Sequence, residues 1–269
     1  NSNDKFTNRL QKNSVFGSSE DSDELTQLTQ CISYVMKTFF EADEYNAKYD
    51  LSYLTGKAWE PGDVKYIDLN DDNKIDRGDN NLKNMGDLTI IGNTTPRYQY
   101  TFNGSISYKD LSLSMMFQGV AKRDWDPGTA PYFWGSGAYA QVTVFNEHMD
   151  YWREDNKDAY YPKPYIHSAG GVGPFRNKTM QTSDRYLQSG AYCRLKNITL
   201  SYNLPSTWVQ KAGLQKVQVF FSGENLLTFT SLKGMFDPEA IFTSNSYTGE
   251  GGKNYPMNKV VSFCLVVNL

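Results

Sequence analysis

The residues with the clearest capacity for chemistry lie in one acidic segment, DLNDDNKIDRGD, which runs from Asp68 to Asp79. A hard divalent cation takes about six to eight oxygen ligands, so alternate residues of a tightly curled loop must turn inward. Oxygen-bearing side chains occupy the first, third, fifth, ninth and twelfth places of this segment. The spacing predicts a structural calcium ion in an EF-hand-type loop, with these ligands: Asp68, Asn70, Asp72, the backbone carbonyl of Lys74, Asp76, and Asp79 directly or through water.

Two residues of this loop depart from the EF-hand pattern. Asn73 stands where such loops carry glycine, although asparagine tolerates the left-handed conformation better than most residues. Asp79 is shorter than the usual glutamate. The preceding segment GDVKYI, residues 62–67, predicts a strand rather than the helix of an EF-hand. We therefore expect a calcium loop outside an EF-hand domain; the alternative is a solvated acidic turn, because Asp and Asn are common turn residues.

The composition excludes several classes of protein. The chain has 269 residues and a net charge of −3, which gives it no nucleic-acid footprint. Three cysteines, Cys31, Cys193 and Cys264, are too few and too far apart for a disulfide framework or a zinc site. No apolar run reaches the roughly 18 residues of a transmembrane helix. The opening NSNDKFTNRL lacks a signal peptide, so we expect either a cytoplasmic chain or a piece of a longer one.

The elements that must position the acidic loop are strands, because the strongest periodicity along the chain is two residues. In RYQYTFNGSISY, tyrosine, phenylalanine and isoleucine alternate with small uncharged polar residues. Lys109 and Asp110 then form a turn, and LSLSMMFQG returns with the same alternation. One greasy face opposite one hydroxyl and amide face is typical of transmembrane barrel strands, although this hairpin alone also fits a soluble β-sandwich.

The connections between strands favour the barrel. Long loops follow every second strand and short ones follow the others, as in bacterial outer-membrane barrels. The sequence therefore predicts an all-β fold, an antiparallel transmembrane β-barrel segment with long extracellular loops. The expected strands are about 98–108, 111–119, 192–204, 216–229 and 258–269, and the outer loops are 120–190 and 230–257.

The first long loop is dense in aromatic residues, with stretches such as RDWDPGTAPYFWGSGAY and YWREDNKDAYYPKPY. Such residues form stiff surfaces that suit sugars or a protein partner. The alternative is that they only pack loop against loop. The candidate substrate or partner contacts are Trp125, Tyr132, Trp134, Tyr151 and Trp152.

We expect no enzyme. His148 and His167 lie in the aromatic loop without a nucleophile motif, and no glycine-rich phosphate loop occurs. Acidic residues such as Glu147, Glu154 and Asp155 could furnish a glycosidase pair, but carboxylates are common in solvated loops.

Five motifs occur in the chain in this order: EPGDVKYIDLNDDNKIDRGD, IIGNTTPRYQYTFNGSISYKDLSLSMMFQGV, SDRYLQSGAYCRLKNITLSYNLP, FFSGENLLTFTSLKGMFDPE and YPMNKVVSFCLVVNL. From about residue 44 onward the sequence resembles the C-terminal part of the SusC/RagA family, the TonB-dependent outer-membrane transporters of the Bacteroidetes. Residues 1–43 do not follow the family pattern, and we expect them to be loop. Residues 44–97 are then an extracellular loop region that contains the calcium-type loop, and residues 98–269 are barrel strands with their outer loops.

The resemblance implies a nutrient importer in the outer membrane. Such a protein works with a SusD-like surface lipoprotein, takes up oligosaccharides or peptides, and uses energy delivered by TonB. It also implies that the plug, the TonB contact and most strands lie outside this chain, which is then a fragment or a truncated gene product. The alternative function is a soluble, calcium-stabilised carbohydrate-binding β-domain, which would express in buffer, whereas a barrel piece would need detergent.

Overall fold

The structure is a computed structural model that describes residues 30–34, 42–54, 59–128, 130–134, 144–164, 178, 180–241 and 255–268. The chain divides into two compact units. The first, here called the loop unit, comprises Asn1–Thr95, Trp125–Leu187 and Phe242–Lys253. The second, here called the sheet unit, comprises Pro96–Asp124, Gln188–Ile241 and Asn254–Leu269.

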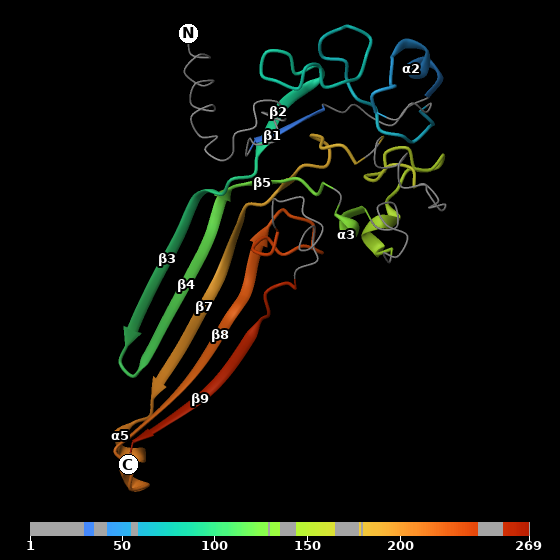
Figure 1. The fold of residues 1–269 in the computed structure, drawn as a ribbon. Helices are drawn as coiled ribbons and strands as arrows, with labels where there is room; N and C mark the ends of the chain where they lie inside the picture. The colour runs from blue at the N-terminus through green and yellow to red at the C-terminus, as the bar shows by residue number, and fades with distance from the viewer. Residues whose placement is uncertain are drawn as a thin grey trace. The chain divides into compact units, whose positions relative to one another are not determined.

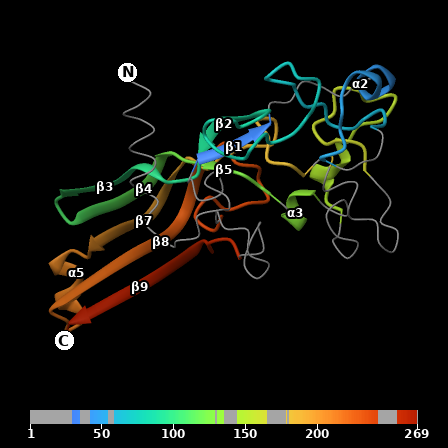
Figure 2. The same ribbon diagram turned by 45° about the horizontal axis from the view of Figure 1, so that its top comes forward.

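The sheet unit contains five long antiparallel strands in which each strand pairs with the next one along the chain. The order across the sheet is β3-β4-β7-β8-β9, and the strands lie side by side in Figures 1 and 2. All five occupy segments predicted from the sequence, with ends that differ by at most three residues. Their bounds are β3 (Arg97–Tyr108), β4 (Leu111–Lys122), β7 (Tyr192–Asn203), β8 (Lys216–Thr230) and β9 (Val260–Asn268).

The register sorts the side chains of this sheet onto two chemically different faces. One row that crosses all five strands contains only hydroxyl residues: Ser105, Ser114, Thr199, Ser222 and Ser262. Because successive residues of a strand point to opposite faces, the neighbouring row on the other face is wholly apolar. It consists of Ile106, Leu113, Leu200, Phe221 and Phe263.

Large side chains on most of the apolar face of the sheet are exposed. Ile106 is 66% exposed and Phe263 is 80% exposed. Tyr108 and Tyr202 are also exposed and lie in the last apolar row, at the end of the sheet where β3 turns into β4. An apolar band that ends in tyrosines is the pattern of a barrel wall facing lipid. The all-β barrel prediction therefore rests on a whole sheet face rather than on one hairpin.

Tight connections join the strands at that same end. Lys109 adopts a positive φ of 53° in the turn between β3 and β4. The connection from β7 to β8 carries the short helix α5 (Ser206–Lys211), which Figure 1 shows beyond the ends of these two strands. The amide of Asn203 donates to the carbonyl of Asp110 at 2.9 Å, which ties the two connections together.

The loop unit holds the remaining elements around a core of large aromatic side chains. Its elements are β1 (Gln30–Tyr34), α2 (Ala42–Lys48), β2 (Leu88–Asn93), α3 (Pro131–Trp134) and the 3-10 helix η2 (Asn146–Met149). The short strands β5 (Asp124–Trp125) and β6 (Gln188–Ser189) mark places where the chain passes between the units. The largest fully buried side chains of this unit include Trp59, Trp125, Tyr45, Tyr66, Tyr186 and Phe133.

Two expectations about the loop unit were wrong. β1 lies within residues 1–43, expected to be loop, and pairs antiparallel with β2. Residues 62–67, expected to be a strand, form none. Their alternating apolar residues instead serve the loop core: Val64 and Tyr66 are buried, and the carbonyl of Val64 accepts from the indole of Trp59 at 2.6 Å. Within the described part of the chain, no helix is long and apolar enough to cross a membrane.

Candidate functional site

Carboxylates of the acidic loop accept hydrogen bonds from backbone amides of the same loop. The carboxylate of Asp68 accepts from the amides of Asp72 at 3.3 Å and of Asn73 at 2.9 Å. The amide of Lys74 donates to Asp72 at 2.8 Å. Asn73 has a φ of 61°, the left-handed conformation that glycine adopts at this place in an EF-hand loop. The backbone therefore follows the curl that the residue spacing predicted.

The apolar residue of this loop anchors it to the loop unit. Ile75 is fully buried, while the side chains around it reach solvent. Its amide donates to the carbonyl of Asp50 at 3.0 Å, and the amide of Asp50 donates to the carbonyl of Asn73 at 2.8 Å. One side of the loop is thus fixed by the segment that follows α2, and the acidic side stays exposed to solvent.

Asp87 is a part of this site that the twelve-residue frame missed. It is buried, and its two carboxylate oxygens accept from the amides of Leu69 at 2.7 Å and Asp76 at 2.9 Å. Burial raises the pKa of the Asp87 carboxyl above its ordinary value; the two amide bonds lower it, and the nearby carboxylates of Asp68 and Asp72 raise it. Asp87 follows the last frame position by eight residues, so ligand spacing could not indicate it.

The last two expected ligands have other contacts. Asp76 accepts from the amide of Gly78 at 2.6 Å. Asp79 accepts from the side-chain amide of Asn84 at 2.9 Å, in the turn that follows the loop. Among the described residues, no group of three or more His, Cys, Asp or Glu side chains is placed to hold a metal ion. A calcium site here depends on the additional oxygens of Asn70 and Lys74.

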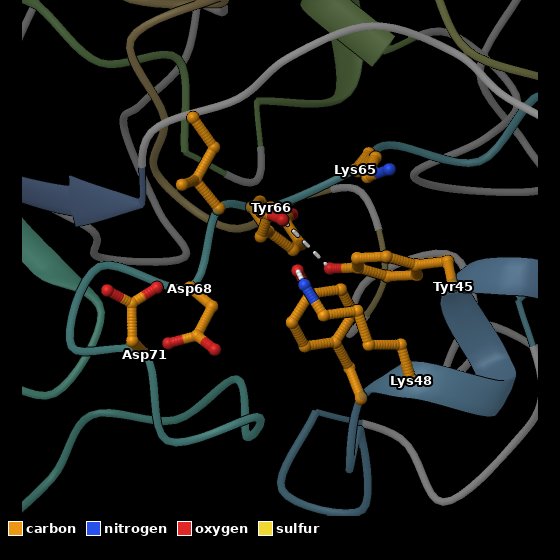
Figure 3. Close-up of a pocket in the computed structure, with 8 residues that line it drawn as sticks. Tyr45, Lys48, Lys65, Tyr66, Asp68 and Asp71 are labelled. Atoms are coloured by element: carbon orange, nitrogen blue, oxygen red, sulfur yellow. Dashed lines mark hydrogen bonds between the residues drawn. The ribbon is translucent and has the colours of Figure 1, made fainter.

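A polar pocket of about 420 Å³ lies between α2 and the first half of the acidic loop. Figure 3 shows Asp68 and Asp71 facing Tyr45 and Lys48 across it. The ammonium group of Lys48 lies 2.7 Å from the hydroxyl of Tyr49, and the hydroxyl of Tyr45 donates to the carbonyl of Tyr66 at 3.0 Å. With basic groups on one side and acidic groups on the other, the pocket suits a small polar ligand. The remaining lining residues are Lys65 and Ile67.

The five aromatic residues that the sequence proposed as contacts fall into two groups. Trp125 is 1% exposed and Trp134 is 7% exposed. Both pack edge-on against Phe133, at centroid distances of 6.3 Å and 4.9 Å, so in this structure they belong to the aromatic core. Tyr132 is 39% exposed, and Tyr151 and Trp152 are partly exposed. Only these three present surface to a ligand or partner.

A buried ion pair in the loop unit was also missed by sequence reasoning. The ammonium group of Lys178 lies 2.8 Å from the carboxylate of Asp63, and both side chains are almost fully buried. The hydroxyl of Tyr66 donates to the carbonyl of Lys178 at 2.7 Å. The pair joins residues 115 positions apart, so no local pattern could show it.

Two of the residues considered for catalysis, His148 and Asp155, have structural contacts. His148 is buried; one ring nitrogen accepts from the amide of Phe145 at 3.1 Å, and the other lies 3.0 Å from the carbonyl of Tyr132. Glu147, Glu154 and Asp155 are exposed, and Asp155 pairs with Arg153. His167 lies outside the described residues.

The amino-acid sequence is similar to parts of two known receptors. No protein-family model matches it. It is 31% identical over 216 residues to TonB-dependent receptor P3 of Formosa agariphila, covering 78% of this chain. It is 27% identical over 179 residues to TonB-dependent receptor P26 of the same organism, covering 66% of this chain. The chain spans only 19% and 16% of the lengths of these two relatives.

Solved structures share the fold. A structure of the RagAB peptide transporter matches 89% of this chain, and 23% of its own, with a TM-score of 0.57 at 20% identity. The RagAB peptide importer in its "open-open" state matches 88% of this chain, and 22% of its own, with a TM-score of 0.56 at 21% identity. These named relatives are receptors and transporters rather than enzymes. Together with the two-faced sheet, they show that the chain belongs to the SusC/RagA family of TonB-dependent transporters and forms one segment of its β-barrel.

Proposed function

We propose that this chain is part of an outer-membrane importer that takes up oligosaccharides or peptides together with a SusD-like lipoprotein, with energy delivered by TonB. The observation that carries this proposal is the asymmetry of the barrel segment. At one end of the sheet, the strands are joined by a two-residue turn and by the short connection containing α5. At the other end, long connections lead from β4 to β7 and from β8 to β9.

The proposal puts the end with the tight turns on the periplasmic side and the end with the long connections outside the cell. Outer-membrane barrels have short periplasmic turns and long extracellular loops. The loop unit, built largely from the first long connection and the residues before β3, then lies outside the cell, where cargo and a surface lipoprotein are met. Tyr132, Tyr151 and Trp152 are its candidate contacts. The exposed apolar face of the sheet argues against the soluble binding domain, because such a face in water would aggregate.

Loss of the full-length protein should abolish uptake of one class of cargo. We expect a deletion strain to stop growing on either oligosaccharides or peptides and to stop taking up labelled forms of that cargo. Removal of TonB should give the same loss. Reintroducing a Tyr132→Ala/Tyr151→Ala variant should restore less uptake than wild type, whereas the turn variant Asp110→Ala should restore it fully. Unchanged uptake of both classes in the deletion strain would contradict the proposal.

We also propose that calcium holds the acidic loop. The fit of the residues to this ion rests on the left-handed Asn73, on the inward closure of Asp68, and on the buried Asp87. A divalent cation would offset the negative charge of Asp68 and Asp72, the two carboxylates that raise the pKa of Asp87. Extracellular calcium modules bind with dissociation constants of about 10⁻⁴ to 10⁻³ M, so such a site stays filled at millimolar calcium.

Chelation should therefore loosen the loop. We expect EGTA to speed proteolysis between residues 63 and 91 of the full-length protein, and added calcium, but not magnesium, to reverse this. The Asp68→Ala/Asp72→Ala variant should be cut equally fast with or without EGTA. Asp155→Ala, which removes an exposed carboxylate elsewhere in the loop unit, should behave like wild type. Identical cleavage of the wild type in EGTA and in calcium would show that the segment is only an acidic turn.

A further inference from the structure

The short helix α5 leaves one large aromatic side chain in solvent. Trp208 is 66% exposed, whereas the next residue, Val209, is buried. The amides of Trp208 and Val209 both donate to the carbonyl of Pro205, at 3.0 Å and 3.2 Å, and the amide of Leu214 donates to the carbonyl of Val209 at 3.1 Å. The turn of helix is thus fixed by backbone bonds and by burial of Val209, and packing gives no reason for tryptophan at position 208.

The position of α5 relative to the apolar face supplies a reason. α5 starts three residues after β7 ends. The last apolar row of the sheet before α5 contains Tyr108, Leu111, Tyr202, Val219 and Leu265, all exposed. Trp208 follows Tyr202 of this row by six residues, and Figure 1 shows its helix α5 beyond the ends of β7 and β8. Tryptophan and tyrosine are favoured where a bilayer meets water, since the ring is apolar and its polar group can stay wet.

We infer that Trp208 is an anchor that inserts into the phospholipid headgroup region, on the membrane side where the tight turns lie. This inference rests on the proposed location of the chain in the outer membrane. It assigns a partner, the lipid interface, to a side chain of the β7 to β8 connection. The neighbouring residues of α5 agree with this assignment: Lys211, in its last turn, is exposed and can meet headgroup phosphates.

Spin-label accessibility tests this assignment. In the full-length protein with Cys31, Cys193 and Cys264 replaced by serine, single cysteines at positions 208, 211 and 106 are spin-labelled and reconstituted in liposomes of phosphatidylethanolamine and phosphatidylglycerol. At each position we take the ratio of the label's accessibility to oxygen to its accessibility to a water-soluble nickel chelate, which is high in lipid and low in water. This ratio should be highest at position 106, several-fold lower but still above the value for water at position 208, and lowest at position 211. A label at 208 as open to nickel as one at 211 would overturn the anchor.

The control at Ile106 separates two failures. If the label at Ile106 reports water, the membrane location itself is wrong; if it reports lipid and 208 does not, only the anchor is wrong. A second measurement keeps the native side chain in case the cysteine variant does not fold. The fluorine resonance of 5-fluorotryptophan at 208, assigned by its loss in Trp208→Phe, should broaden with headgroup-region nitroxide lipid and not with a soluble gadolinium chelate. Broadening by gadolinium alone would overturn the inference.

Discussion

Replacing Arg194 by methionine is expected to lower the free energy of unfolding of the full-length protein by about 3–5 kcal/mol, because it leaves the buried carboxylate of Asp237 without a counter-charge and removes one of the two cations paired with Glu239. Arg194 lies on β7 and is 3% exposed. Its guanidinium lies 2.8 Å from Asp237 and 3.1 Å from Glu239, and it donates to the hydroxyl of Thr228 at 2.8 Å. Both carboxylates belong to the segment after β8, so one side chain fastens that segment to the sheet.

Unfolding in urea with detergent, together with hydrogen exchange, checks this expectation. The amide of Met257, just before β9, donates to Asp237 at 2.9 Å and should exchange faster in the variant. The control is Lys196→Met, which removes a partly exposed ion pair to Glu239 and should cost about 0–1 kcal/mol. Adding Asp237→Asn and Glu239→Gln to Arg194→Met should recover part of the loss. Equal effects of Arg194→Met and Lys196→Met would contradict the buried clamp.

Acid should weaken the same fastening. Burial alone would raise the pKa of the Asp237 carboxyl, but hydrogen bonds from the amide of Glu239, from Arg194 and from the amide of Met257 hold this pKa below its ordinary value. A depressed folded-state pKa means that the stabilisation is complete above the unfolded-state pKa of about 4 and is lost as the pH falls through the folded value.

Gly119→Ala is the second change with a large expected effect, about 1–3 kcal/mol of destabilisation from overpacking. Gly119 lies on β4, in the row of the apolar face that also contains Tyr100. A methyl group there would overlap the carbonyl oxygen of Tyr192 and the ring and hydroxyl of Tyr100. The tyrosine ring covers the glycine, and its hydroxyl donates to the Tyr192 carbonyl at 3.3 Å, so the added carbon must displace both.

A matched glycine in the same unit controls for the substitution itself. Gly234 has no atom within 4 Å of its would-be side chain, so Gly234→Ala should change stability by no more than about 0.5 kcal/mol. Combining Gly119→Ala with Tyr100→Ala should restore only part of the loss, because the carbonyl of Tyr192 remains in the way. Thermal unfolding of the three variants in detergent measures this, and equal stabilities of Gly119→Ala and Gly234→Ala would refute the tight contact.

The strands could be predicted from the sequence because a barrel wall imposes one physical rule at every second residue. Tyr100, Phe102 and Ile106 alternate with polar residues, which is the pattern of a barrel wall that meets lipid on one side only. The same rule gives no information on partners far along the chain. Arg194 and Asp237 are 43 residues apart, and nothing near either residue indicates the other.

The loop unit was harder to predict because aromatic packing has no period. Trp134 is buried and Tyr132 is exposed within one short helix, although both read as equally good contact residues. The acidic loop was easier to predict than the aromatic packing and harder to predict than the strands. Its curl could be predicted from ligand spacing, but its closure by Asp87 could not, because that residue follows Gly86 outside any repeating frame.

The order of the five strands has a consequence for handling this protein. Within the described residues, β3 and β9 each pair on one side only, so the other side of each presents a row of unpaired amides and carbonyls. In hydrocarbon each such group costs several kcal/mol, and in water such a row is a template for another strand. A polypeptide of these residues made alone would thus pair strand to strand with its own copies and aggregate.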